Sequence, residues 1–497
     1  MSHLNRRRFL KRSLAAAGGA LLAGGCASAE KNAGRMGAAP TGRVIGANDR
    51  IRVAVAGVNG RGMSHLNAFT TIPNCQVTHV IDPDSRLFAS RIKFVEEKGK
   101  NTPKVLQDIR QILDDKSIDV IATASPNHWH SLITIWACQA GKDVYVEKPM
   151  SHNIHEGRIA VETARRYNRI VQHGTQSRSD MGFAKVVAAI HSGKLGKLLV
   201  SRALCYKSGG GESTRGSIGW KPFIAPPKEL DFDLWLGPAQ VQPYHENLVH
   251  YRWHWFWNFG NGDLGNQGVH QMDIARWAIK GATLPRSAIS FGGRLGYLDQ
   301  GEVASTQMAI LDFGETQLIF ETRGLPSEKY KGEGVGNIFE LEAGTICGKK
   351  FYPKGSSEPA PLPEVAVTER PSGNEHFKNF VAAVRSRKVS DLNADVLEGH
   401  YSSACCHLCN MSIRVGDKIP FRPRTTLFDD NPAALDVLER TEKHLAANGV
   451  DIEKTGYTMG HKLLVDAKTE RITNNPDADA LVTRNYRKPY VVPSKVV

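Results

Sequence analysis

The chain has few cysteines and no long hydrophobic run after its N-terminal segment, and each absence excludes a class of protein. Eight cysteines among 497 residues are too few for a fold held together by disulfides. No later run reaches roughly eighteen apolar residues, so no membrane-spanning helix is predicted there. The formal net charge of +14 is interleaved with acidic residues rather than gathered with aromatics, which argues against a nucleic-acid partner. The length suits two globular domains.

Metal and thiol chemistry also find little support. Cys406 and Cys409 have the C-x-x-C spacing, but residues 395–416 have the pattern of one long helix. We interpret these cysteines as small residues packed on a helix face, with a redox or metal pair as the alternative. The histidines between positions 128 and 254 are not joined by Asp or Glu at ligand spacing, so no metal site is predicted.

The first 29 residues differ in composition from the rest. A basic stretch, "NRRRFLKRS", precedes small apolar residues that end in "ASA" at Ala29. The paired arginines followed by Phe-Leu-Lys resemble a twin-arginine export signal, with Asn5 where Ser or Thr is usual. We predict export to the periplasm by that pathway; a general secretory signal and a basic amphipathic tail are the alternatives. Lipid attachment at Cys26 stays open, and we interpret residues 30–48 as a linker.

Two different patterns divide the remaining sequence. Residues 49–174 alternate between continuous apolar runs, such as 51–57, and amphipathic stretches, such as 85–99. This alternation predicts a parallel, doubly wound α/β sheet. Residues 175–420 carry strand-like runs with fewer helices between them, which indicates an α+β domain with a largely antiparallel open sheet. Residues 421–497 are polar with Pro and Asn-Asn breaks, so we predict an irregular C-terminal extension.

The stretch "VAVAGVNGRGMSH", residues 53–65, resembles a G-x-G-x-x-G dinucleotide fingerprint with one position changed. Gly57 and Gly62 stand at the first and third glycine positions, and Asn59 replaces the second. Asn tolerates left-handed backbone angles better than most residues, and Gly60 adds freedom beside it. The loop can therefore bring its backbone close to a pyrophosphate at a helix N-terminus. A strand, turn and helix without a ligand are the alternative.

The next apolar strand ends at Asp82, twenty residues past Gly62. A carboxylate there accepts hydrogen bonds from both hydroxyls of an adenosine ribose and repels a 2′-phosphate, which favours NAD over NADP. Arg86 keeps NADP open as the cofactor. The alternative interpretation is that Asp82 only caps the helix that follows.

Five further stretches match one family when they are taken together. They are "SPNHWH", "YVEKP", "LDFDLWLGP", "GNGDLGNQGVHQMD" and "HFKNFVAAVRSRK". With the glycine loop, they make the chain similar to the glucose–fructose oxidoreductase, inositol dehydrogenase and MocA (Gfo/Idh/MocA) family over nearly all of the sequence after the export signal. The resemblance implies an NAD(P)-binding Rossmann domain at 49–174 and a substrate-binding α+β domain at 175–420, whose open sheet face forms the substrate site.

The resemblance also implies catalytic roles for three residues. Lys148, in "YVEKP", would lie near the nicotinamide and exchange a proton with the reacting hydroxyl. His270, in "GVHQMD", would take that proton as a neutral imidazole. Asn266 lies one helical turn before His270, on the same face, where sugar dehydrogenases of the family usually carry Asp. Because Asn cannot charge-tune the histidine, simple dehydrogenase activity is in doubt. A surface lysine and a core histidine are the alternatives.

The remaining candidates surround the cofactor and the substrate. Trp253 and Trp257 alternate with Trp255, so in a strand the three would share one face and could stack on a sugar ring; a core stripe is the alternative. Asp273, which ends "GVHQMD", is assigned to the substrate by resemblance. The cofactor contacts that the resemblance implies are Gly57, Asn59, Gly60, Arg61, Gly62, Asp82, Ser125, Asn127, His130, Glu147 and Lys148.

Export of a folded protein constrains the chemistry, because free NAD is not expected outside the inner membrane. The cofactor would stay bound and be regenerated in each cycle. We therefore predict an NAD(P)-dependent oxidoreductase that acts on a sugar or polyol hydroxyl. One alternative is a redox-neutral, NAD-dependent glycoside hydrolase similar to family 109, with Tyr251 or His254 as candidates for the α-carbon base. The other is a periplasmic sugar-binding module. We expect a small carbohydrate as substrate and assembly of the chain into a homo-oligomer.

Overall fold

The computed structural model describes residues 49–207, 215–367 and 375–496. The predicted export signal, Cys26 and the linker lie outside the described residues. Among the helices that are described, none combines the length and hydropathy needed to span a bilayer.

The N-terminal sheet has six parallel strands in the order β3-β2-β1-β4-β5-β6, so the predicted doubly wound sheet is confirmed. Strands β1, β4 and β5 are buried along almost their whole length, as expected for strands covered on both faces. The strand order reverses between β1 and β4, and such sheets bind ligands at the carboxyl ends of the strands beside that reversal. The elements are β1 (Ile51–Ala56), α2 (Gly62–Thr71), β2 (Cys75–Ile81), α3 (Phe88–Gly99), β3 (Lys104–Leu106), β4 (Val120–Thr123), α4 (Asn127–Gln139), β5 (Asp143–Val146), α5 (Ile154–Arg166) and β6 (Val171–His173).

The second sheet has eleven strands, most of them in the order β13-β12-β11-β7-β10-β9-β8-β15-β14. Its pairs are antiparallel except for β7 with β10, which confirms the predicted, largely antiparallel sheet. The strands are β7 (Leu198–Tyr206), β8 (Ser287–Gly293), β9 (Thr306–Asp312), β10 (Gln317–Arg323), β11 (Val335–Leu341), β12 (Gly344–Cys347), β13 (Lys350–Pro353), β14 (Asp417–Pro420), β15 (Gly456–Met459), β16 (Leu463–Asp466) and β17 (Arg471–Ile472). The helices before β14 are α6 (Met181–His191), α7 (Phe232–Leu236), α8 (Gly262–Gly265), α9 (Gly268–Ala278), α10 (Glu375–Ser386) and α11 (Val396–Arg414).

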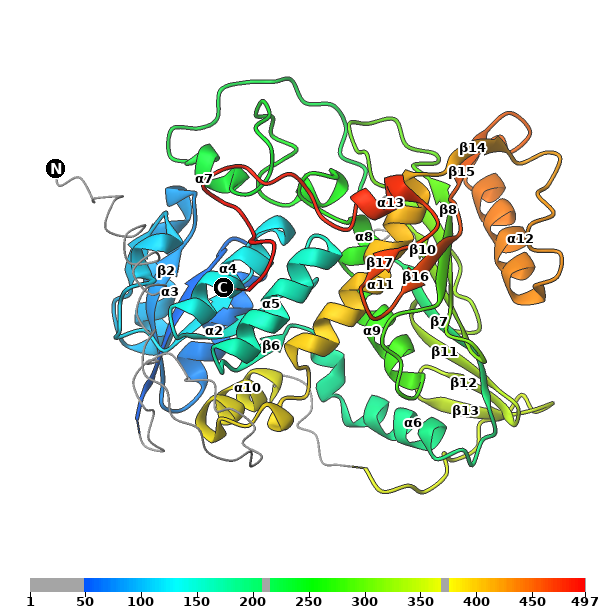
Figure 1. Ribbon diagram of the computed structural model, residues 1–497, viewed down its shortest axis with the longest axis horizontal. Helices are drawn as coiled ribbons and strands as arrows, with labels where there is room; N and C mark the ends of the chain where they lie inside the picture. The colour runs from blue at the N-terminus through cyan, green and yellow to red at the C-terminus, as the bar shows by residue number, and fades with distance from the viewer. Residues whose placement is uncertain (1–48, 208–214, 368–374, 497) are drawn as a thin grey trace, which may run out of the picture. The chain divides into compact units, whose positions relative to one another are not determined.

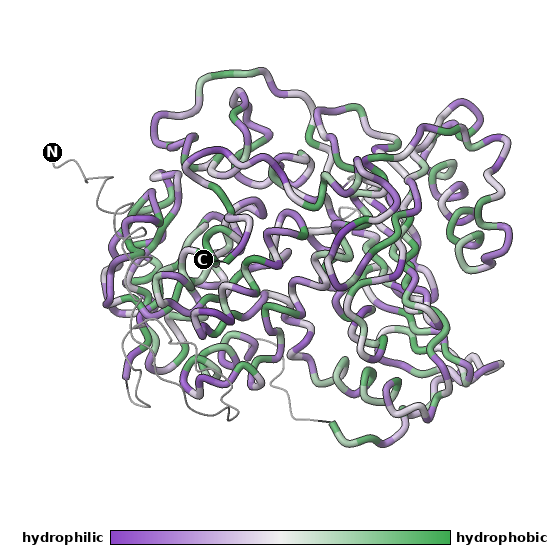
Figure 2. Tube along the Cα trace, viewed as in Figure 1, coloured by the Kyte–Doolittle hydropathy of each residue, from purple (hydrophilic) through white to green (hydrophobic). Residues whose placement is uncertain are grey.

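Helices cover both faces of this second sheet (Figure 1). Helices α9 and α11 pack on the face that carries Leu311 and Phe320. Helix α12 (Pro432–Ala447) packs on the opposite face, against Phe291 and Ile319. Figure 2 shows the hydrophobic stretches, in green, along these strands and along α12. The open face that the family resemblance implied is therefore partly covered.

The long helix predicted around the C-x-x-C pair is confirmed as α11. Cys406 and Cys409 are free and fully buried in its packed face. Burial raises the pKa of both thiols, so they stay protonated near neutral pH. These contacts agree with the interpretation of the two cysteines as packing residues.

The prediction of an irregular tail after residue 420 is wrong. The tail contains α12, α13 (Pro476–Ala480) and the short strands β15, β16 and β17. Strands β15 and β16 both pair with β8, so distant partners rather than a local pattern fix their conformation. The start of α12 did have a local signal that was missed. The Asn431 side chain accepts from the Ala434 N–H, and Pro432 follows it.

Two later segments return to the N-terminal sheet, so the predicted domain boundary at residue 174 does not enclose all of its core. Helix α10 places Phe377 on Tyr145, with ring centroids 4.4 Å apart. Near the chain's end, Tyr490 packs against Trp129 of α4, with centroids 5.4 Å apart. Figure 1 shows this last segment, in red, running back to α4. The two sheets are thus joined by several crossings of the chain.

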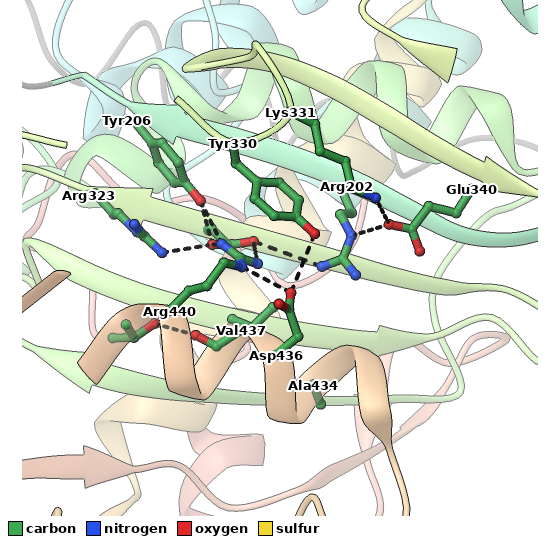
Figure 3. A network of polar contacts seen from close by, with 12 residues as sticks. Arg202, Tyr206, Arg323, Tyr330, Lys331, Glu340, Ala434, Asp436, Val437 and Arg440 are labelled. Carbon is green, nitrogen blue, oxygen red and sulfur yellow. Dashed lines mark hydrogen bonds and ion pairs between the residues drawn. The ribbon is translucent and has the colours of Figure 1, made fainter. Parts of the chain in front are cut away.

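A buried ion cluster attaches α12 to the second sheet (Figure 3). Arg440 of α12 donates two hydrogen bonds of 2.7 Å to the carboxylate of Glu321 in β10, which is fully buried. Tyr206 and Arg323 also donate to this carboxylate. Burial acts to raise the pKa of Glu321, but Arg440 outweighs it and lowers that pKa below its ordinary value. Arg440 also bonds Asp436 at 2.9 Å, in a more exposed position.

We predict that Glu321→Gln lowers the free energy of unfolding by about 3–5 kcal/mol, because it leaves buried guanidinium groups without their anion. Asp436→Asn removes the exposed partner of the same arginine and should cost about 1 kcal/mol or less. Urea unfolding of both variants checks this. Equal losses in the two variants would show that the buried pair does not anchor the helix.

Candidate active site

A cavity of about 320 Å³ lies where the carboxyl ends of β1, β2, β4 and β5 meet the second half of the chain. The N-terminal sheet contributes the glycine loop and residues within 81–83 and 124–130. The second half of the chain contributes residues 234–235, residues within 250–254, residues 266–267 and Lys207, directly after β7. The cavity stands at the reversal of strand order, and residues far apart in the sequence meet in it.

The glycine loop needs glycine at two of its positions. Gly57 has a φ of +76°, and a Cβ there would lie 2.4 Å from the backbone nitrogen of Ser125. A Cβ on Gly62 would lie 2.0 Å from the carbonyl oxygen of Gly57, whereas a Cβ on Gly60 would meet nothing within 4 Å. Asn59 is accommodated between them, and its carbonyl oxygen accepts from Arg91. The loop therefore keeps the tight backbone approach of a dinucleotide fingerprint.

Asp82 holds this loop and faces the cavity. Its carboxylate accepts from the N–H of Val58 at 2.9 Å and from the N–H of Asp84 at 3.1 Å. Burial raises the pKa of Asp82, and these two backbone donors oppose that shift. The helix-cap role belongs to Asp84 instead, which accepts from the Arg86 N–H and binds the Arg86 guanidinium. Asp82 lines the cavity, and Arg86 is not among the lining residues.

Glu147 is a buried carboxylate that holds the glycine loop through an ion pair with Arg61. It accepts from Arg61 Nε at 2.7 Å and lies 3.2 Å from His65 Nε2. Burial acts to raise the pKa of Glu147, but the hydrogen bond from His65 and the charge of Arg61 hold it well below its usual range. Both Glu147 and Arg61 line the cavity, as their predicted cofactor contact requires.

The segment after β4 forms another wall. Ser125, Asn127 and His130 all line the cavity. The two ring nitrogens of His130 lie 2.6 Å from the carbonyl oxygens of Ser125 and Pro149. Burial lowers the pKa of His130, and its ring joins this wall to the segment that carries Lys148. The structure thus brings every predicted cofactor contact except Gly62 directly into the lining, and Gly62 shapes the loop.

A chain of three polar groups crosses the cavity. Lys148 Nζ donates to the carbonyl oxygen and to the Oδ1 of Asn266, at 2.9 and 2.8 Å. Asn266 Nδ2 donates to the hydroxyl of Tyr251 at 3.2 Å, and that hydroxyl also accepts from Arg215 at 2.7 Å. Burial lowers the pKa of Lys148 to about 8, against the opposing charge of Glu147. We call this the Lys148–Asn266–Tyr251 chain.

Further polar residues of the lining were missed or named only by proximity in sequence. Lys207 donates to Gln267 at 2.8 Å, and nothing in the local sequence marked either residue. His250 lies 2.8 Å from a carboxylate oxygen of Asp84. The ring of His254 stacks on Trp253 with centroids 3.6 Å apart, and burial lowers the pKa of His254 to about 3, so the ring is neutral. Tyr251 and His254, which were candidates only because they are close in sequence, both line this cavity.

The three alternating tryptophans do not form a stripe. Residues 252–255 form a 3-10 helix rather than a strand, so the alternation puts the indoles in different places. Trp253 lines the cavity, whereas a Cβ on Gly216 would lie 2.4 Å from the indole of Trp255. Trp257 lines a separate cavity. Of the two tryptophans predicted to bind substrate, only Trp253 reaches this cavity.

The two predicted site residues of "GVHQMD", His270 and Asp273, lie outside the lining. Asp273 is fully buried, where it accepts from Arg178 Nε at 2.8 Å and from Ser402 Oγ at 2.6 Å, so it stabilises α9 and is not placed to bind substrate. Asn266 follows α8, which ends at Gly265, and α9 begins at Gly268, so Asn266 and His270 do not share one helix face as predicted. Burial, with the charge of Lys148, lowers the pKa of His270 to about 3. Its Nδ1 is buried without a hydrogen-bond partner among the described residues.

The described residues contain no group of three or more His, Cys, Asp or Glu side chains that could hold a metal ion. The uncapped start of α2 and the buried Asp82 suit a dinucleotide with its pyrophosphate at the loop and its ribose at the carboxylate.

Together these features define a two-domain fold with a dinucleotide-binding cavity between a parallel and a largely antiparallel sheet. Residues 51–175 match the model of the oxidoreductase family with an NAD-binding Rossmann fold, and residues 216–288 match the family's C-terminal alpha/beta domain. The chain is similar to this family, GFO/IDH/MocA, over these two segments, and the resemblance stated from the sequence is confirmed.

The chain is also similar to curated relatives and, in fold, to solved structures. The chain is 30% identical over 214 residues to glycosyl hydrolase family 109 protein 2 of Shewanella sp. (strain ANA-3), and 28% identical over 210 residues to the family 109 protein of Shewanella pealeana. These matches cover 41% and 40% of this chain but 46% and 45% of the relatives, so the chain spans about half their length.

Among solved structures, the WlbA dehydrogenase of Bordetella pertussis, in complex with NADH and UDP-GlcNAcA, is 17% identical with a TM-score of 0.52. The match covers 73% of this chain and 97% of that one. The WlbA dehydrogenase of Chromobacterium violaceum is 16% identical with a TM-score of 0.54, and the match covers 74% of this chain and 95% of that one. At this identity the likeness supports the fold alone.

The glycine geometry predicts how the loop tolerates substitution. Gly62→Ala should weaken NAD binding by about tenfold or more, because its Cβ meets the loop's own backbone. Gly60→Ala is the matched control, and we expect its affinity to stay within about twofold of the parent since the space there is open. Fluorescence titration with NAD measures both, with circular dichroism to compare the folds. Equal affinities in the two variants would contradict the assignment of the loop.

Proposed function

We propose that this protein is an NAD-dependent enzyme that oxidises a hydroxyl group of a sugar or polyol. The observation that carries the proposal is the position of Lys148. Its ammonium is held by Asn266 in the same cavity as the dinucleotide loop, and burial lowers its pKa to about 8. A lysine with a pKa near neutral is suited to proton transfer, because both of its forms are populated at working pH.

Each residue of the Lys148–Asn266–Tyr251 chain has a distinct part. NAD, when bound, supplies the acceptor for the two electrons that leave a sugar hydroxyl on oxidation. Neutral Lys148 takes the proton from the hydroxyl oxygen. Asn266 fixes the direction of the lysine through two acceptors, and it links the lysine to the Tyr251 hydroxyl. Asp82 selects the ribose, and the pairing of Arg86 with Asp84 favours NAD over NADP.

A second candidate function is redox-neutral glycoside hydrolysis, in which the sugar is oxidised, loses its aglycone, adds water and is reduced again. Two observations favour it. The cavity holds Tyr251 and His254 beside Lys148, and elimination needs a second proton-transfer group at the carbon next to the oxidised one. The curated relatives described above are named as family 109 glycosyl hydrolases. The sugar-binding module is disfavoured because such a module has no need of a half-buried lysine held by Asn266 in the same cavity as the cofactor loop.

The compartment and the assembly belong to the same proposal. We infer export by the twin-arginine pathway from the N-terminal "NRRRFLKRS", with delivery of the folded protein to the periplasm and its NAD already bound. Cys26 is the position for lipid attachment if the exported protein is anchored. We further propose a homo-oligomer, which size-exclusion chromatography with light scattering tests directly.

Substrate panels separate the two candidate functions. An oxidoreductase should produce NADH absorbance with free sugars and added NAD, whereas a redox-neutral hydrolase should release nitrophenol from p-nitrophenyl glycosides with no net NADH. Lys148→Ala should reduce the observed reaction by about 10²–10⁴-fold with its NAD content, measured by mass spectrometry, unchanged. Lys221→Ala, at a surface ion pair, is the control and should keep full activity. Full activity in Lys148→Ala would remove the proposed role of this lysine.

The hydrogen bond from Lys148 to Asn266 predicts how kcat/KM depends on pH. In the parent, kcat/KM for the substrate found above should rise with pH through an inflection near the lysine pKa of about 8, because the neutral amine is the active base. Asn266→Asp places a carboxylate 2.8 Å from the ammonium, which raises the lysine pKa and should move the inflection upward by about one unit or more. Gln267→Glu, beside Lys207, should move it less. An unchanged profile in Asn266→Asp would assign the inflection to another group.

A further inference from the structure

A second cavity of about 450 Å³ shares no lining residue with the candidate active site. It is built from the segments just beyond those that line the first one: residues 152–153 follow Lys148, and residues within 257–261 follow the 250–254 segment. Helix α11 and the C-terminal residues 480–485 complete it. We call it the arginine cavity, after Arg414 and Arg484.

The lining of the arginine cavity is basic and contains no Asp or Glu among the described residues. Neither Arg414 nor Arg484 has a carboxylate of the described residues within 4.0 Å. Arg484 instead donates to the carbonyl oxygen of Asn258 at 2.9 Å and lies 3.2 Å from His152 Nδ1. Burial, and then the charge of Arg484, lowers the pKa of Arg414, so the two cations disfavour one another. An anion between them would relieve this repulsion.

The two nearby carboxylates are already engaged. Glu156 lies behind the lining, where it accepts from Asn153 Nδ2 at 2.8 Å and from the His152 N–H at 3.1 Å. Burial raises the pKa of Glu156 to about 7, so near neutral pH it neutralises Arg484 only in part. Glu302, on the side of Arg414, accepts from the backbone N–H of Trp257. The positive charge of the cavity is therefore only partly compensated within the chain.

The neutral part of the lining suits sugar hydroxyls and a sugar ring. Amide side chains are frequent in it, including Asn153, Asn258 and Asn261. Asn261 is 4% exposed, and its Nδ2 has no hydrogen-bond partner among the described residues, which leaves a buried donor for a ligand. His152 Nε2 is unpartnered in the same way. The indole of Trp257 supplies an aromatic surface, with the Arg414 guanidinium 5.1 Å from its centroid.

We propose that the arginine cavity binds a small acidic sugar. Arg414 and Arg484 take its carboxylate, and the amides and His152 bond its hydroxyls. The volume is in the range of roughly 300–1,000 Å³ that is typical of small-molecule sites. This site is separate from the proposed reaction and does not depend on it.

Isothermal titration calorimetry of the full chain with sodium glucuronate tests the proposal, with glucose and sodium acetate as the two partial ligands. We expect glucuronate to bind about tenfold or more tightly than either, because only it offers both the carboxylate and the hydroxyls. Arg414→Gln should weaken glucuronate binding by about tenfold or more, and Arg414→Lys should recover part of it. Arg286→Gln, at an exposed arginine elsewhere on the second sheet, is the control and should bind as the parent does.

Three results would overturn the proposal. One is the absence of glucuronate binding to the parent. Another is binding no tighter than that of acetate or glucose. The last is affinity that Arg414→Gln and Arg414→Lys leave unchanged. Lys148→Ala separates the two sites, since it should retain glucuronate binding whatever its effect on turnover. Loss of binding in Lys148→Ala would place the acidic sugar in the active site and not in the arginine cavity.

Discussion

The hydrogen bonds between Lys148 and Asn266 are the interaction on which the rest of the site depends. Lys148 follows β5 of the N-terminal sheet, and Asn266 follows α8 in the second half of the chain. The contact therefore exists only when the two halves are packed together. It fixes a flexible side chain in a partly dry cavity, where desolvation brings the lysine pKa close to neutral. Packing between the sheets is thus what makes the lysine chemically useful.

The parts of the site that the sequence predicted are those set by short-range geometry. Gly57 is required by its left-handed φ, Gly62 by its contact with the Gly57 carbonyl within the same turn, and Asp82 by its position at the end of the next strand. Such constraints leave a spacing in the sequence. The alternation of strands and helices likewise predicted the parallel sheet, because each apolar run is covered on both faces.

The parts that could not be predicted depend on distant partners. Asp273 matches a motif position, but Arg178 and Ser402 hold it in the core. The indoles of residues 253–257 separate because the segment turns as a 3-10 helix. The strands of the tail exist because β8 offers them an edge, which no local pattern records. In each case the outcome was set by contacts more than fifty positions away or by a turn without a periodic signal.

The hydrogen bond with Lys148 gives Asn266 a different role from the one that the sequence suggested. From the sequence it was a weakened companion for His270, because an amide cannot charge-tune an imidazole. In the structure its amide oxygen faces the ammonium of Lys148. A carboxylate there would stabilise the charged lysine and hold its proton; a neutral amide orients the lysine and leaves desolvation to set its pKa. The asparagine therefore keeps a lysine that can both take and return a proton near neutral pH. An oxidation alone requires only the first of these steps, whereas a cycle that oxidises and then reduces its substrate requires both.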